Sequence, residues 1–204
     1  MVDVMCETLE AAFHLILYVR GVYPQCSSPA FPRLSVLTPL VAIFQRVQKY
    51  GMPVHQARHP DVQSYISDVI VSLRPWLLKR VLQRVAFVIC SDVMTPLERF
   101  VFEIAPGDPH RLLDADYVQA YMRSFFLKIN TVDASMPPNT AGTTFSVVCY
   151  TTSDAQEAAG PEEMLVWEPV DDASVAPSDG RIVPLKSMNE GAMKIQLYVE
   201  RPAE

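Results

Sequence analysis

The chain has 204 residues, of which half are hydrophobic and a fifth are charged, and these values are typical of a globular protein with a substantial core. Its formal net charge of −6 argues against a broad nucleic-acid surface, because such surfaces need an excess of lysine and arginine. The sequence begins without the basic residues of a signal peptide and contains no apolar run of membrane-spanning length, so we expect neither a signal peptide nor a membrane partner.

The four cysteines are widely spaced and form no Cys-x-x-Cys pair, which argues against a disulfide framework and against a thiolate zinc site. We therefore expect a reducing compartment, the nucleus or the cytosol.

Residues 3–20 show an almost completely apolar helical pattern, which predicts a central helix that ends at Gly21 and Pro24. Residues 25–42 contain three prolines and no sustained period, which predicts an inserted loop. Residues 43–52 form a short amphipathic or extended piece. His55 and His59 follow with a zinc-like spacing, but the prolines at 53 and 60 favour an ordinary loop, so we expect no metal.

A second helix is predicted from Pro60 to residue 73 by the clearest helical period of the chain. Pro75 is expected to kink or end it, leaving a further turn or two. Basic residues surround Trp76 there, and they fit either a nucleic-acid contact or, as we favour, a solvated helix end: Arg74, Lys79, Arg80 and Arg84.

Residues 85–90 are continuously apolar and predict a buried strand, which should form an antiparallel hairpin with the alternating residues 97–104. Asp114 is placed to cap a third helix, with a buried face formed by Val118, Tyr121, Met122, Phe125 and Ile129.

Residues 142–152 predict a central strand with partners on both sides, in which Phe145, Val147 and Cys149 point to one face. Residues 153–180 carry eight acidic residues and no lysine or arginine, too polar to fold alone. Two strand signals follow, a short one at 182–185 and a strong one at 193–199.

A catalytic site is not indicated by any known motif. The single tempting set is Cys90, Asp92 and His110, and a small thiol-dependent enzyme is the alternative that it leaves open. Because Cys90 ends a buried strand, we favour a non-catalytic binding module that needs no cofactor.

Several segments resemble the HORMA-domain family, and within it the accessory subunits of translesion DNA polymerase zeta. These segments run in the family's order from residue 14 to residue 200: HLILYVR at 14–20, IFQ at 43–45, KY at 49–50, FVFEI at 100–104, LKI at 127–129, PLK at 184–186 and QLYVE at 196–200. The resemblance implies an α+β fold of three helices on a central antiparallel sheet. It also implies a single domain, with a core at 1–152 and a carboxy-terminal safety belt at 153–204.

The resemblance further implies that the belt closes over a linear peptide of the polymerase's catalytic subunit, with Tyr65 and Trp167 lining the groove. It assigns a second surface to the carboxy-terminal domain of a scaffold translesion polymerase, through Ile182, Gln196 and Tyr198. Such main-chain capture of an extended peptide needs no direct contact with nucleic acid.

Arg123, Lys128 and Ala134 match the face through which HORMA domains pair as homodimers or heterodimers. For these residues, and for the two partner surfaces, ordinary core packing or a solvated face stays open as the alternative. A spindle-checkpoint HORMA adaptor that regulates the anaphase-promoting complex is the neighbouring function. The resemblance favours the nucleus, with the cytoplasm as a second location.

Overall fold

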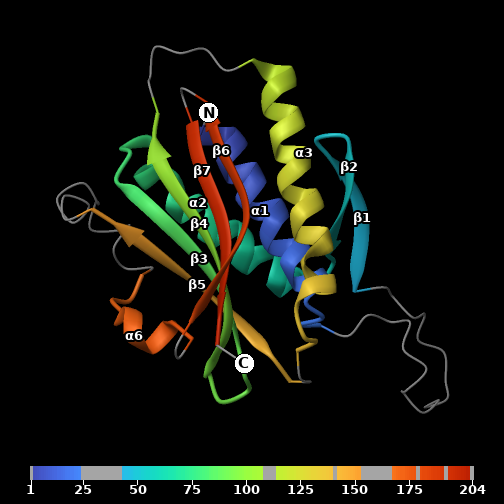
Figure 1. The fold of residues 1–204 in the computed structure, drawn as a ribbon, viewed down its shortest axis with the longest axis vertical. Helices are drawn as coiled ribbons and strands as arrows, with labels where there is room; N and C mark the ends of the chain where they lie inside the picture. Colours follow the sequence, from blue (N-terminus) through green and yellow to red (C-terminus); the bar gives the residue numbers. More distant parts are fainter. Residues whose placement is uncertain are drawn as a thin grey trace.

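The fold is an antiparallel sheet of five strands with three long helices on one face, and a separate two-stranded hairpin packs beside them (Figure 1). This arrangement confirms the expected α+β class. The computed structural model describes residues 2–23, 43–107, 114–139, 142–152, 167–177, 180–190 and 193–202.

Helix α1 (Val2–Val19) is the central helix, because α2 (Pro60–Leu78), α3 (Ala115–Thr131) and the hairpin all pack against it. Its apolar side chains are buried almost all the way round, as the sequence predicts for a helix in that position. Asp114 caps α3 as expected, since its side chain accepts a hydrogen bond from the main-chain N–H of Asp116.

The hairpin of β1 (Phe44–Lys49) and β2 (Met52–Ala57) corrects the prediction of a loop around His55. Tyr50 and Gly51 form its two-residue turn with φ values of 50° and 70°, and such a turn matches the twist of paired strands. Among the described residues β2 pairs only with β1, and such an edge strand tolerates Pro53, which has no N–H.

Pro75 does not end helix α2, which continues to Leu78, and the further turn that the sequence predicts after the proline is present as part of the same helix. Trp76 and Leu77 are buried in the main core, and this burial holds the last turn although the proline removes one helical hydrogen bond. Packing of the helix end thus outweighs the local cost of Pro75.

The five-stranded sheet has the order β5-β3-β4-β7-β6 with every neighbouring pair antiparallel. The hairpin expected at 85–104 is confirmed, and the short strand expected at 182–185 is longer than predicted. The strands are β3 (Leu82–Cys90), β4 (Pro96–Pro106), β5 (Thr144–Thr151), β6 (Arg181–Glu190) and β7 (Met193–Arg201).

Among the described strands β5 lies at the edge of the sheet and pairs only with β3, so the prediction of a central strand with partners on both sides is wrong. Its side chains do alternate as predicted: Phe145 and Val147 join the core under the helices, while Val148 joins the opposite face. The apolar composition of both faces suggested a central position, but it reflects cover by other parts of the chain and not a second strand.

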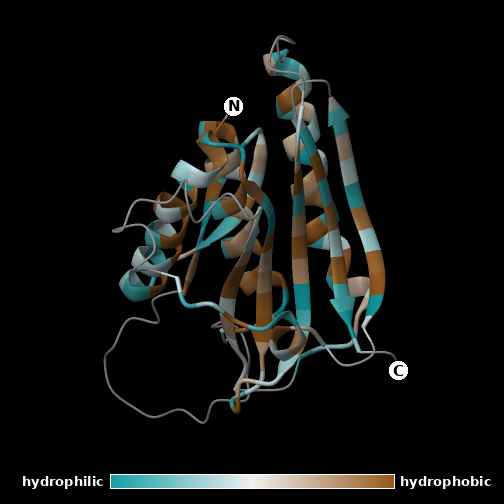
Figure 2. Cartoon of the chain, turned by 90° about the vertical axis from the view of Figure 1, so that its left-hand side faces the viewer, coloured by the Kyte–Doolittle hydropathy of each residue, from teal (hydrophilic) through white to brown (hydrophobic). Residues whose placement is uncertain are grey.

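The sheet separates two hydrophobic clusters of unequal size, and Figure 2 shows hydrophobic and hydrophilic bands alternating along the strands. The larger lies between the sheet and the helices, where Phe13, Phe87 and Phe102 pack together. The smaller lies on the other, outer face of the sheet, and the belt helix α6 (Asp172–Val175) packs against it through Val175.

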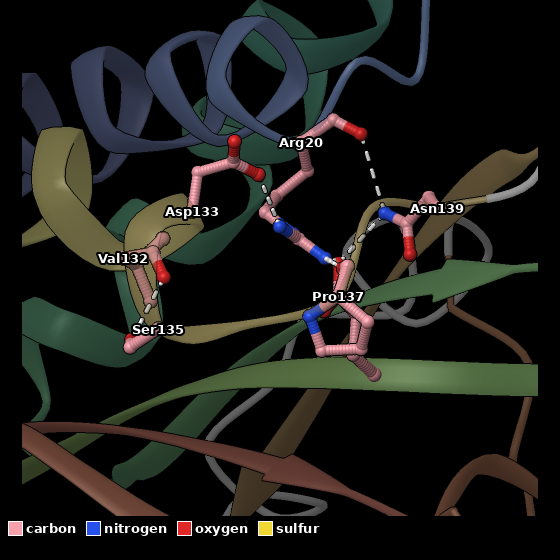
Figure 3. Close-up of polar contacts among 7 residues, drawn as sticks. Arg20, Val132, Asp133, Ser135, Pro137 and Asn139 are labelled. Atoms are coloured by element: carbon pink, nitrogen blue, oxygen red, sulfur yellow. Dashed lines mark hydrogen bonds and ion pairs between the residues drawn. The ribbon is translucent and has the colours of Figure 1, made fainter.

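Arg20 joins the end of α1 to the sheet and to the connection between α3 and β5 (Figure 3). Its guanidinium donates to Glu98 at 2.7 Å, to Asp133 and to the main-chain oxygen of Pro137. The side-chain amide of Asn139 donates to the main-chain oxygen of Arg20 and to the same Glu98 oxygen that accepts from the guanidinium, so it adds a second hydrogen bond to this buried carboxylate.

Several predicted features lie outside the described residues: the whole inserted loop at 25–42, which includes Cys26, the first part of the acidic segment, and His110. Within the described parts of the chain, no helix is long and apolar enough to cross a membrane.

Candidate functional site

A groove lies along the outer edge of β5, where the belt segment from Trp167 onward crosses above it. The groove contains a cavity of about 290 Å³. Its walls come from α2, from β5 and from the belt: Trp76, residues 147–151, residues 167–170 and Asp172. Three segments distant in the sequence therefore form one site.

The floor of the groove is a sheet edge whose main-chain groups have no strand partner in the described structure. The N–H of Thr152 points toward β3, where it donates to Val81. Because main-chain groups alternate in direction along an antiparallel strand, Phe145, Val147 and Cys149 present their N–H and C=O groups outward. An extended chain can therefore add to the sheet here.

Tyr65, which the resemblance assigned to the groove, lies beside Phe145 of this edge strand but is not among the residues that line the cavity. Its ring lies edge-on to Phe145 at 5.5 Å, and 43% of its surface is exposed. Burial raises the pKa of Tyr65, and a hydrogen bond with the main chain of Val147 lowers it in part. The phenol thus already contacts a main-chain group of the free edge.

Trp167 connects the belt to α2. Its indole N–H donates to the hydroxyl of Ser72 at 3.1 Å, and its ring lies 5.7 Å from that of Trp76. Tyr65 and Trp76 are eleven residues apart on α2, which corresponds to about 16 Å of helix. Trp167 lines the cavity, whereas Tyr65 is not among the residues that line it and makes a separate aromatic contact with Phe145.

The belt side of the groove is acidic. Glu168 and Asp172 line the cavity, Asp171 caps α6, and all three side chains are exposed.

Cys149 also lines the cavity, and burial raises the pKa of its thiol to about 12, so it stays protonated at neutral pH.

Comparison with curated proteins finds relatives over nearly the whole chain. The sequence is 37% identical over 209 residues to the mitotic spindle assembly checkpoint protein MAD2B of Bos taurus and 36% identical to that of Homo sapiens, covering 98% of this chain and 90% of each relative. The DNA polymerase zeta processivity subunit of Arabidopsis thaliana is 28% identical, over 98% of this chain and 85% of the relative. The chain belongs to the MAD2B family.

Solved structures support the fold. A chain of the mitotic checkpoint complex crystal structure superposes with a TM-score of 0.77 at 23% identity, over 100% of this chain and 99% of the other. HTP-2 bound to a motif of HTP-3 superposes with a TM-score of 0.70 at 12% identity, over 100% and 90%. These likenesses confirm the expected HORMA fold. No protein-family model matches the chain.

The surface that the resemblance assigned to a second partner gathers on the outer face of the sheet. Gln196 and Tyr198 alternate with core residues along β7, and Ile182 stands opposite Glu200 on the same face. Ile182 is 59% exposed and Gln196 is exposed, whereas Tyr198 is 7% exposed within the smaller cluster. Ile182 and Gln196 are therefore the accessible members of this set of three residues.

The residues matched to the pairing face of HORMA domains are exposed at the outer side of α3 and just beyond it. Arg123 and Lys128 lie on α3, and Ala134 lies in the following 3-10 turn η1 (Val132–Ser135). Leu127 is 54% exposed between the two basic residues, so this face also has an apolar element.

The set considered for thiol catalysis is not assembled in the described structure. Cys90 is 3% exposed, and burial raises the pKa of its thiol. Asp92 is exposed in the turn after β3, and His110 lies outside the described residues. Among the described side chains, no group of three or more histidines, cysteines or acidic residues could hold a metal ion.

The basic cluster around Trp76 is divided between two parts of the structure. Arg74 pairs with Asp3 of α1, while Arg84 lies over the ring of Tyr150 on the other face of the sheet. Trp76 itself is a wall of the groove. Sequence reasoning missed its role and those of Ser72, Tyr150 and Asp172, although the presence of two tryptophans in the whole chain was a usable signal.

Proposed function

We propose that this protein is a non-catalytic accessory subunit of DNA polymerase zeta that holds a linear peptide of the catalytic subunit under its belt. The observation that carries the proposal is the unpaired edge of β5, which faces a cavity roofed by Trp167. The name of the Arabidopsis thaliana relative, DNA polymerase zeta processivity subunit, supports the choice of polymerase.

Capture would combine two contributions. Main-chain hydrogen bonds to the edge of β5 bind any extended segment, whereas the aromatic contacts at Tyr65 and at Trp167 select its side chains. The belt strand β7 already pairs with β4, and β6 pairs with β7, so both belt strands belong to the sheet while the edge of β5 remains available among the described residues. A bound segment would then lie between the belt and the sheet, which slows its release.

We also propose a second partner, the carboxy-terminal domain of a scaffold translesion polymerase, on the surface of Ile182, Gln196 and Tyr198. Arg123, Lys128 and Ala134 would contact another HORMA domain. Because the proposed partners act on DNA, we propose the nucleus as the location of the protein, with the cytoplasm as a second location.

The direct test is calorimetric titration of the full-length protein with peptides from the catalytic subunit. We expect binding of a peptide that spans the linear motif and none of a peptide with the same composition in scrambled order. Failure of every segment of the catalytic subunit to bind would overturn the proposal.

A spindle-checkpoint adaptor is the second candidate, because the animal relatives carry that name. The two functions predict the same groove and different guests. A competition in which a checkpoint client's linear motif displaces the polymerase peptide would favour the checkpoint function.

A further inference from the structure

Arg99 forms a buried polar cluster on the outer face of the sheet, beside the groove. Its guanidinium donates to Asp172 of the belt helix α6 at 2.7 Å, to Glu200 of β7 and to the hydroxyl of Tyr150 of β5 at 2.6 Å. The Tyr150 hydroxyl in turn donates to Asp172. One side chain of β4 therefore contacts the edge strand, the last strand and the belt.

The charges of this cluster are balanced. The Arg99 side chain is 6% exposed and faces two carboxylates, one on Glu200 at 14% exposure and one on Asp172 at 57%. Arg84 adds a second cation over the Tyr150 ring, at 4.7 Å from its centre. Because the Asp172 end is open to solvent, it is the part of the cluster that can separate without exposing the core.

Two members of the cluster also line the groove, since Tyr150 and Asp172 both belong to the wall of the cavity. Asp172 begins α6, only five residues after Trp167. The contact with Arg99 therefore fixes the part of the belt that follows the tryptophan roof.

We propose that Arg99 is a positioning residue for guest capture: through Asp172 it holds the belt against β5 and so slows the release of a bound peptide. The proposal rests on the proposed function and adds to it the side chains that determine how long the guest is retained. Arg99 acts through the belt and does not contact the guest itself.

The test compares Asp172→Asn with Asp171→Asn in the full-length protein. Both variants remove one negative charge from the same short helix. Asparagine at 171 retains the helix cap, because it can accept the hydrogen bond from Ala173 as aspartate does. The readout is the dissociation rate of a fluorescent catalytic-subunit peptide chased with unlabelled peptide.

We expect Asp172→Asn to accelerate dissociation about five- to tenfold, the usual effect of losing the charge from one ion-assisted hydrogen bond. The association rate and the melting temperature should stay close to those of the unsubstituted protein, which a purely structural role would not predict. Arg99→Lys should retain part of the effect of arginine, since it keeps the charge and loses the forked geometry.

Equal dissociation rates for the two asparagine variants would overturn the proposal while leaving the proposed function intact. If the unsubstituted protein binds no peptide, amide hydrogen exchange of residues 167–177 in the guest-free protein decides the matter. Faster exchange in Asp172→Asn than in Asp171→Asn supports the role of Arg99, and identical exchange overturns it.

Discussion

Glu98 and Arg99 are neighbours on β4, yet they anchor opposite faces of the same sheet. Glu98 points to the helices, where it pairs with Arg20 at 2.7 Å, and both side chains are almost fully buried. Arg99 points to the belt, where its partner Asp172 is largely exposed. The Arg20–Glu98 pair therefore belongs to a permanent core, and the Arg99–Asp172 pair belongs to a contact that can open.

The physical basis of the difference is the cost of separation. Breaking a fully buried pair leaves an uncompensated charge inside the protein, whereas water can replace the partner of a half-exposed carboxylate. The helix face is therefore expected to respond to substitution through stability, and the belt face through the lifetime of a bound guest.

The largest expected effect is on the helix face, with Arg20→Met. The substitution leaves Glu98 buried without its partner, and we expect the free energy of unfolding to fall by about 3–5 kcal/mol in urea titrations. The double variant Arg20→Met with Glu98→Leu should recover part of this loss. If Arg20→Met were as stable as the unsubstituted protein, the Arg20–Glu98 pair would not be the permanent contact that distinguishes the helix face from the belt face.

A second prediction concerns the dependence of stability on pH, which should differ between the helix face and the belt face of the sheet. His14 is 1% exposed on α1, and burial lowers its pKa from 6.5 to about 4. The unfolded state therefore binds more protons between these values, and stability should fall by about 3 kcal/mol as pH drops from 6.5 to 4.

The belt contact should be insensitive over the same range. Hydrogen bonds from Tyr150 and Arg99 lower the pKa of Asp172 below 3.8, so the contribution of Asp172 to stability is lost only at more acidic pH.

Thermal unfolding between pH 6.5 and pH 4 measures the contribution of His14. The melting temperature of His14→Asn should depend less on pH than that of the unsubstituted protein. An unchanged slope would mean that His14 does not carry the effect.

Trp167→Ala sharpens the comparison on the belt side. Loss of the indole removes its bond to Ser72 and its contact with Trp76, and we expect peptide affinity to fall by more than about 1 kcal/mol in calorimetry. Val93→Ala is the control, because Val93 is 76% exposed in a turn between β3 and β4. If the Trp167 variant bound the peptide with unchanged affinity, Trp167 would make no contribution to the free energy of peptide binding.

The smallest expected effect on the fold comes from Ile182→Ala. Ile182 is largely exposed, so its removal should leave stability and peptide affinity within about 0.5 kcal/mol while weakening the second partner. Tyr198→Ala should weaken that partner too, but with a loss of stability, because Tyr198 is buried. Surface plasmon resonance against the scaffold polymerase domain checks both variants. If the two variants and the unsubstituted protein bound this domain equally well, the surface would not be its binding site.

Local patterns in the sequence predicted most of the elements. The helical period at 60–73 and the cap at Asp114 were confirmed because they depend on neighbouring residues. Local rules were insufficient where packing decided the outcome: Pro75 does not end α2, because Trp76 is buried, and His55 lies in a strand, because β2 closes a hairpin.

The groove was predicted only in part for a related reason. Tyr65 and Trp167 were named through a family resemblance, but nothing local in the sequence shows that Trp76 and Trp167 lie 5.7 Å apart. Likewise, Arg99 and Asp172 are 73 positions apart, and no pattern of spacing pairs them.

The sequence by itself determined the alternation of side chains, the apolar central helix and the family, because these depend on residue types in order. The tertiary structure decided that β5 is an edge strand, and that Arg20 and Arg99 anchor different faces. Those facts depend on which distant segments meet, and the free energy of a long-range contact is not encoded in any one stretch of the chain.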